Sequence, residues 1–137
     1  MCRIIIYISK ILRVIVLGKI NSKQKGKNGE LEFAHECEKY GFMDVHRTAQ
    51  TNGKLEQSLA DCEGLPNIHI EVKRVEQLNI DKAMEQSVRD LQTKKEKRIP
   101  VVFHRKNRKP WKATMLLEDW MTIYKGYLEY LKTINKD

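Results

Sequence analysis

The sequence predicts an α/β fold in which a mixed β-sheet is flanked by helices. Its 137 residues suffice for one domain with a single hydrophobic core. Hydrophobic residues make up 41% of the chain and charged residues 32%, which is typical of a folded globular protein. Segments with helical spacing of apolar residues and segments of strand-like alternation follow one another in the order helix, three strands, helix, two strands, helix.

The first predicted helix covers residues 30–40. Apolar side chains recur there at spacings of three and four residues, and Gly41 follows as a helix stop. Glu30 lies on the core-facing side of this helix, three and four residues before Phe33 and Ala34. Two interpretations of Glu30 stay open: it binds a cation, or it favours the helix dipole as a first-turn carboxylate.

The segment after this helix is predicted to form strands. Residues 43–47 indicate a short strand, and residues 51–53, with an Asn-Gly pair, a turn before Leu59. The clearest strand is 68–73, because strict alternation sends one set of side chains to each face of the sheet. Ile68, Ile70 and Val72 share one face, and His69, Glu71 and Lys73 share the other.

The second half of the chain predicts a helix, a hairpin and a closing helix. Asn79 is a plausible cap for a helix with the buried stripe Ile80, Ala83, Met84, Val88 and Leu91. Strands over 99–103 and 111–116 are joined by the basic turn 106–110. The inner stripe of the closing helix is expected to be Trp120, Ile123, Tyr124, Tyr127, Leu128 and Leu131.

The N-terminal residues are expected to form an extension of uncertain structure, residues 1–24, before a main domain over 25–137. The apolar stretch 4–17 is interrupted by Lys10 and Arg13 and is shorter than the roughly 20 residues that span a membrane, so no membrane role is expected. The polar stretch 21–29 predicts a linker.

The cysteines indicate a reducing compartment. Three of them, Cys2, Cys37 and Cys62, lie far apart without zinc-site spacing, so we expect free thiols in a cytoplasm. No phosphate-binding glycine motif occurs, so no nucleotide cofactor is expected.

The charge distribution suggests a polyanionic partner. The chain carries 26 lysines and arginines against 18 acidic residues. Residues 29–93 hold thirteen acidic and seven basic side chains, whereas 1–28 hold seven basic and no acidic ones and 94–112 hold nine basic and one acidic. An acidic middle between basic segments suits divalent cations surrounded by phosphates, although an uneven solvated surface would give the same counts.

The strongest chemical pattern is Asp61, followed after nine residues by Glu71, Val72 and Lys73. Carboxylates at the ends of adjacent strands can hold Mg²⁺, and Lys73, on the same strand face as Glu71, can orient water and offset charge on a phosphorane. An exposed salt bridge on one strand face is the ordinary alternative.

Together with Glu30, this pattern resembles the PD-(D/E)xK nuclease superfamily, and within it the archaeal-type Holliday junction resolvases and their phage-encoded relatives. The resemblance covers about 25–130 and is carried by KGKNGE (25–30), GF (41–42), HRTAQ (46–50), ADCEGLPNIHIEVKRVE (60–76) and PVVFHRKNRKPW (100–111). Ala60 stands where the superfamily has a proline, and the loop 50–58 does not align with the serine-bearing loop of the archaeal enzymes.

The resemblance implies a restriction-endonuclease-like core and a catalytic set of Glu30, Asp61, Glu71 and Lys73, with the three carboxylates binding Mg²⁺ or Mn²⁺. It implies a DNA endonuclease that resolves four-way junctions as a homodimer, in the cytoplasm of a bacterial host if phage-encoded. Two alternatives stay open: a structure-specific or repair nuclease on flaps, nicks or duplex DNA, and a catalytically inactive DNA-binding module.

Further residues are candidates for DNA contacts. Arg47 and Gln50 fall in the HRTAQ match, and each is equally interpretable as a surface side chain. Gln86 lies near the stripe of the second helix, where a surface glutamine is the slightly favoured interpretation. The basic hairpin is suited to phosphates and base stacking. It comprises His104, Arg105, Lys106, Arg108, Lys109 and Trp111.

Overall fold

The structure, a computed structural model, describes residues 22–48 and 59–135. Within these ranges the order of elements is the predicted one, and the α/β class is confirmed. The elements are a helix over residues 22–38, β1 (His46–Arg47), β2 (Cys62–Glu63), β3 (Ile68–Arg74), α2 (Ile80–Lys94), β4 (Ile99–Arg105), β5 (Lys112–Met115) and α3 (Leu117–Ile134).

The strands form one five-stranded mixed sheet in the order β1-β2-β3-β4-β5. The central pair, β3 and β4, is parallel, with α2 as its crossover, and the other pairs are antiparallel. Because Arg74 is paired with Arg105, both central strands end at the same edge of the sheet. The side chains that follow these strands therefore come together there.

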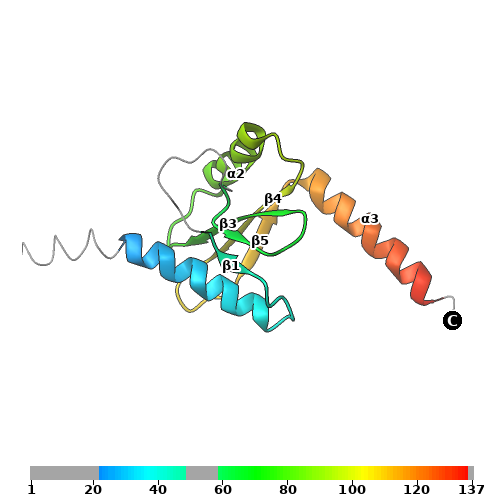
Figure 1. Ribbon diagram of the computed structural model, residues 1–137, viewed down its shortest axis with the longest axis horizontal. Coiled ribbons are helices and arrows are strands. Elements are labelled where there is room, and N and C mark those ends of the chain that lie inside the picture. The colour runs from blue at the N-terminus through cyan, green and yellow to red at the C-terminus, as the bar shows by residue number, and fades with distance from the viewer. Residues whose placement is uncertain (1–21, 49–58, 136–137) are drawn as a thin grey trace, which may run out of the picture.

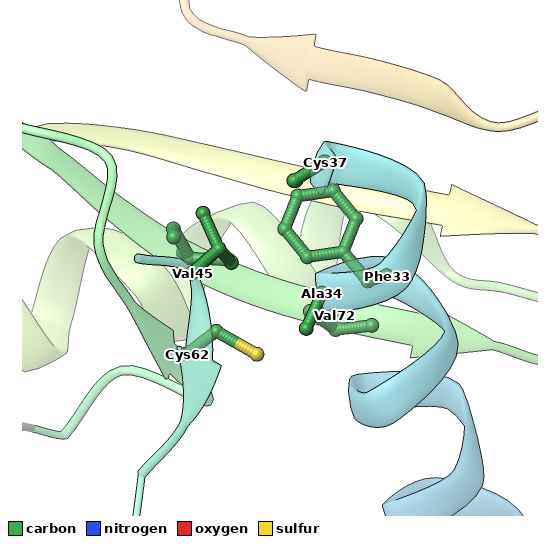
Figure 2. Packing of buried hydrophobic residues seen from close by; sticks show 7 residues of the cluster. Phe33, Ala34, Cys37, Val45, Cys62 and Val72 are labelled. Atoms are coloured by element: carbon green, nitrogen blue, oxygen red, sulfur yellow. The ribbon is translucent and has the colours of Figure 1, made fainter. Parts of the chain in front are cut away.

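Helices cover both faces of the sheet. On one face the helix 22–38 packs Phe33, Ala34 and Cys37 against Val72 and its neighbours (Figure 2). On the other face Ala83 and Met84 of α2 pack against Val102. Since side chains alternate along β3, Ile70 and Val72 enter the first layer, and His69 and Glu71 turn toward α2.

The second helix begins and ends at identifiable signals. The Asn79 side chain accepts a 3.0 Å hydrogen bond from the Lys82 N–H, which confirms the predicted cap. Lys95 ends the helix in the left-handed conformation, with its N–H donating to the carbonyls of the last turn. Of the predicted stripe, Ala83, Met84 and Leu91 are buried, together with Ser87.

The linker predicted over residues 21–29 is wrong where it can be checked, because residues 22–29 are helical. Lysine and glutamine are good helix formers, and the Gln24 amide donates a 3.0 Å hydrogen bond to the Asn28 side chain one turn later. Gly29 is buried for a packing reason, since a Cβ there would lie 2.9 Å from Cβ of Arg74. The glycine thus lets the helix approach the end of β3 closely.

The prediction for the closing helix is right about helical structure and wrong about burial. None of the residues of α3 is buried, and the helix extends away from the sheet (Figure 1). The helix 22–38 and α2 already cover both faces of the sheet, which leaves the stripe of α3 no core to join. Among the described residues, no helix is both long and apolar enough to cross a membrane.

Candidate active site

Asp61 is fixed beside β3 by backbone hydrogen bonds. It directly precedes β2, and its N–H donates to the carbonyl of Ile70 over 2.9 Å. Its carboxylate Oδ2 accepts a 2.8 Å hydrogen bond from the Val72 N–H. Burial raises the pKa of Asp61 against the lowering effects of that N–H and of Lys73. The sheet therefore holds one carboxylate next to the middle of β3, as the spacing of Asp61 and Glu71 predicts.

Glu71 and Lys73 form an ion pair on one face of β3, as alternation predicts. Lys73 Nζ lies 2.6 Å from Glu71 Oε1, and the Glu71 side chain is only 1% exposed. Burial, reinforced by the negative charge of Asp61, raises the pKa of Glu71 to about 7, whereas Lys73 works in the opposite direction. Burial disfavours the charged form of Lys73 as well, but the pair with Glu71 leaves its pKa raised.

Glu30 approaches the same place from the helix 22–38. The Cys62 thiol, next to Asp61, contacts the Glu30 carbonyl at 3.7 Å, and the negative charge of Glu30 contributes to the raised pKa of Asp61. The Glu30 carboxylate forms an ion pair with Arg47. The cation that pairs with Glu30 in this structure is thus a guanidinium. Gln50 lies outside the described residues.

The carboxylates of the three predicted metal ligands are too far apart in this structure to share one ion. Among the described residues, Glu30, Asp61 and Glu71 are not a group whose ligand atoms all lie within 4.8 Å of one another, whereas His69, Glu71 and Asp90 are. Asp90 also contributes to the raised pKa values of both Asp61 and Glu71. A divalent ion shared by the predicted trio would need a rearrangement of the Glu30 and Arg47 side chains.

Sequence reasoning missed His69, Ser87 and Asp90. His69 shares the strand face of Glu71, and Ser87 and Asp90 follow the buried stripe of α2 at a spacing of three residues. These signals were present in the sequence, but no motif linked a strand to the helix that covers it. Gln86, the predicted contact from α2, is exposed.

The basic hairpin divides into a structural part and an exposed part. His104 Nε2 lies 2.9 Å from Thr114 Oγ1 across the hairpin. Arg105 pairs with Glu32, and its guanidinium lies 5.3 Å from the ring centre of Trp111. Trp111 contacts Phe33 of the core edge to face, at 5.5 Å between ring centres. Arg105 and Trp111 therefore hold the hairpin on the helix 22–38.

The exposed part is the turn after β4. Lys106, Arg108 and Lys109 are exposed, and the Asn107 N–H donates a 2.8 Å hydrogen bond to Glu76, which follows β3. The turn thus lies at the edge of the sheet where β3 ends, close in register to Lys73. These three cations are free to meet a phosphate chain.

A groove of about 1250 Å³ opens beside this turn. It runs between the start of α2 and the β4–β5 hairpin, and Glu76 and Asp81 are the carboxylates in its lining. Lys112, on β5, also lines it and was missed because it was assigned to a strand without regard to its face. The basic side chains of the lining are His104, Arg105, Lys106, Lys109 and Lys112.

Comparison with known proteins adds no relative: no protein-family model, curated protein or solved structure matches this chain.

Proposed function

We propose that this chain is a metal-dependent DNA endonuclease of the PD-(D/E)xK type, with a restriction-endonuclease-like core, that resolves four-way junctions in the cytoplasm. The observation that carries the proposal is the juxtaposition of Asp61, Glu71 and Lys73 at the central strand. The Asp61 carboxylate accepts a hydrogen bond from the N–H of Val72, the residue after Glu71. Glu71 in turn forms an ion pair with Lys73 at 2.6 Å. A buried Glu71 and a half-buried Asp61 beside one lysine are typical of a site that binds a charged ligand.

The carboxylates suit Mg²⁺ or Mn²⁺. Glu71 Oε2 is buried without a hydrogen-bond partner among the described residues, and an ion would satisfy it. Glu30 would join Asp61 and Glu71 once Arg47 turned to a phosphate, since an arginine moves readily from carboxylate to phosphate. The bound ion would supply Lewis acidity and lower the pKa of a coordinated water.

The chain's own residues then account for the remaining chemistry. Water attacks the phosphorus, the bond to the 3′ oxygen breaks, and the products are a 5′-phosphate and a 3′-hydroxyl. The Lys73 ammonium, held beside Glu71, orients the water and offsets the growing negative charge on the phosphoryl oxygens. The exposed turn with Lys106, Arg108 and Lys109 holds the phosphates that flank the cleaved bond.

A junction cut symmetrically on two strands needs two sites related by a twofold axis, so the proposal includes a homodimer. The exposed stripe of α3 is the surface that fits a second copy. It contains Trp120 and Tyr124, stacked at 5.0 Å, and further exposed apolar residues. Glu118 and Asp119 lie in the first turn and Lys132 in the last. An antiparallel pair of α3 helices would bring opposite charges together.

Cleavage of a defined set of substrates tests the proposal. An immobile four-way junction, a flap and a linear duplex, all labelled, are incubated with Mg²⁺ or with EDTA. Paired symmetric cuts in the junction only, abolished by EDTA, are the expected result. Equal cutting of all three substrates would favour the repair nuclease over the resolvase. Binding without metal-dependent cutting would favour the inactive DNA-binding module.

A further inference from the structure

A second polar cluster lies between β3 and α2, on the side of Glu71 away from the basic turn. His69, two residues before Glu71, faces α2, and Asp90 projects toward it from the helix. One ligand atom from each of His69, Glu71 and Asp90 lies within 4.8 Å of the other two. The groups come from a strand and from the helix that covers it.

The burial of this cluster is unexplained by hydrogen bonding. The His69 side chain is 1% exposed, and neither ring nitrogen has a hydrogen-bond partner among the described residues. Ser87 lies one turn before Asp90 and is fully buried. Its hydroxyl has no hydrogen-bond partner within residues 22–48 and 59–135. A buried polar group without a partner destabilises the folded state, so these groups favour a ligand that satisfies them.

The donor set selects a type of ion. One imidazole nitrogen with two carboxylates is a combination typical of Zn²⁺, Mn²⁺ and related first-row ions, whereas Mg²⁺ prefers oxygen ligands alone. Asp90 is half-buried, so the cluster reaches solvent at the side of α2, where an ion can enter and keep bound water. Three protein ligands leave such positions open.

We propose that His69, Glu71 and Asp90 bind one divalent first-row transition-metal ion. Glu71 then links this ion to Lys73, whose Nζ lies 2.6 Å from Glu71 Oε1. The site does not depend on nuclease activity, since His69 and Asp90 are outside the catalytic set. An ion in it would fix Glu71 in its charged form and hold α2 against the sheet.

Co²⁺ is a suitable probe, because its visible absorption changes when nitrogen and oxygen ligands replace water. The parent protein is the full chain with Cys2→Ser, which removes a thiol that lies outside the described residues. With Mg²⁺ in excess to occupy the carboxylates of the nuclease site, we expect one equivalent of Co²⁺ to bind and Zn²⁺ to displace it. Asp90→Asn should weaken binding by about tenfold or more, because it removes a charged ligand while preserving shape.

Two matched variants separate this site from its surroundings. Asp81→Asn, an exposed change in the first turn of α2, should bind Co²⁺ like the parent. Asp61→Asn should keep Co²⁺ binding while it abolishes cleavage, so failure of the metal site and failure of the nuclease proposal give different results. Loss of Co²⁺ binding in Asp61→Asn together with unchanged binding in Asp90→Asn would overturn the assignment.

A metal titration of the parent protein, in which His69, Glu71 and Asp90 are unchanged, gives a result that does not depend on whether a variant folds. Histidine ring signals are followed by nuclear magnetic resonance while Zn²⁺ is added. The His69 signals should shift at one equivalent. A response confined to His35, His46 and His104, or no binding of either ion, would overturn the proposal.

Discussion

At the scale of single residues, the properties of the site depend on how costly it is to bury the Glu71 carboxylate. Its pKa is about 7 in the folded chain, chiefly because of burial and then because of Asp61, against an ordinary value of 4.5. A carboxyl whose pKa is raised on folding destabilises the folded state once it ionises. The penalty is absent below the ordinary value, grows as the pH rises toward about 7, and is then complete.

The pH dependence of stability tests this directly. In EDTA, Glu71→Gln should gain stability relative to the unchanged protein by about 2 kcal/mol between about pH 5 and about pH 8. Urea unfolding at both pH values measures the difference. A difference that is independent of pH would mean that Glu71 is not held in a poorly solvated place.

Two glycines of the first helix offer a second residue-scale prediction. Gly26→Ala should stabilise the protein by about 0.5–1 kcal/mol, because nothing lies within 4 Å of the added methyl group and alanine favours helix. Gly29→Ala should instead destabilise it by about 1–2 kcal/mol, because the methyl group would meet Cβ of Arg74 at 2.9 Å. Thermal unfolding of both variants measures the contrast. Equal stabilisation by the two changes would contradict the close approach of helix and strand.

At the scale of elements, strand alternation predicted more of the site than helix periodicity did. Alternation along 68–73 placed Glu71 and Lys73 on one face, and the 2.6 Å ion pair agrees. Helix periodicity identified the amphipathic α3 but not what it packs against, because that depends on faces already occupied by other elements. His69 and Asp90 were missed for a related reason: the pairing of a strand with its covering helix is a tertiary property.

The basic turn after β4 is predicted to contribute to DNA binding. Arg108→Ala combined with Lys109→Ala should weaken DNA binding and reduce the slope of log affinity against log salt by about 1–2, because two phosphate contacts are lost. The control is Lys97→Ala with Lys125→Ala, which removes the same charge elsewhere. Binding isotherms at several salt concentrations measure the slope. A slope unchanged by the first pair would remove the turn from the DNA-binding surface.

At the scale of the whole molecule, the order of elements and the mixed sheet were predictable, because each element has its own periodicity. The extent of the first helix was not, since Gly29 suggested a break in sequence and serves close packing in the structure. The direction of α3, which leaves the domain, was not predictable either. An exposed apolar helix face of this kind is typical of a surface that contacts another protein.

Assembly through α3 can be tested by sedimentation. Tyr124→Glu with Tyr127→Glu should shift the chain from dimer to monomer, because two charges enter the apolar stripe. Thr122→Glu with Thr133→Glu, the same charges on the polar side of α3, should leave the dimer intact. Dimers that persist in the tyrosine variant would exclude α3 as the interface.

The central claim, that Asp61, Glu71 and Lys73 form a nuclease site, is tested most directly by the rate of junction cleavage in Mg²⁺ for two lysine variants. Lys73→Ala should reduce the rate by about 100-fold or more while junction binding is retained, because charge stabilisation at the reacting phosphate is lost. Lys97→Ala, an exposed lysine before β4 at the opposite edge of the sheet, should cleave like the unchanged protein. Equal rates for Lys73→Ala and the unchanged protein would contradict the account.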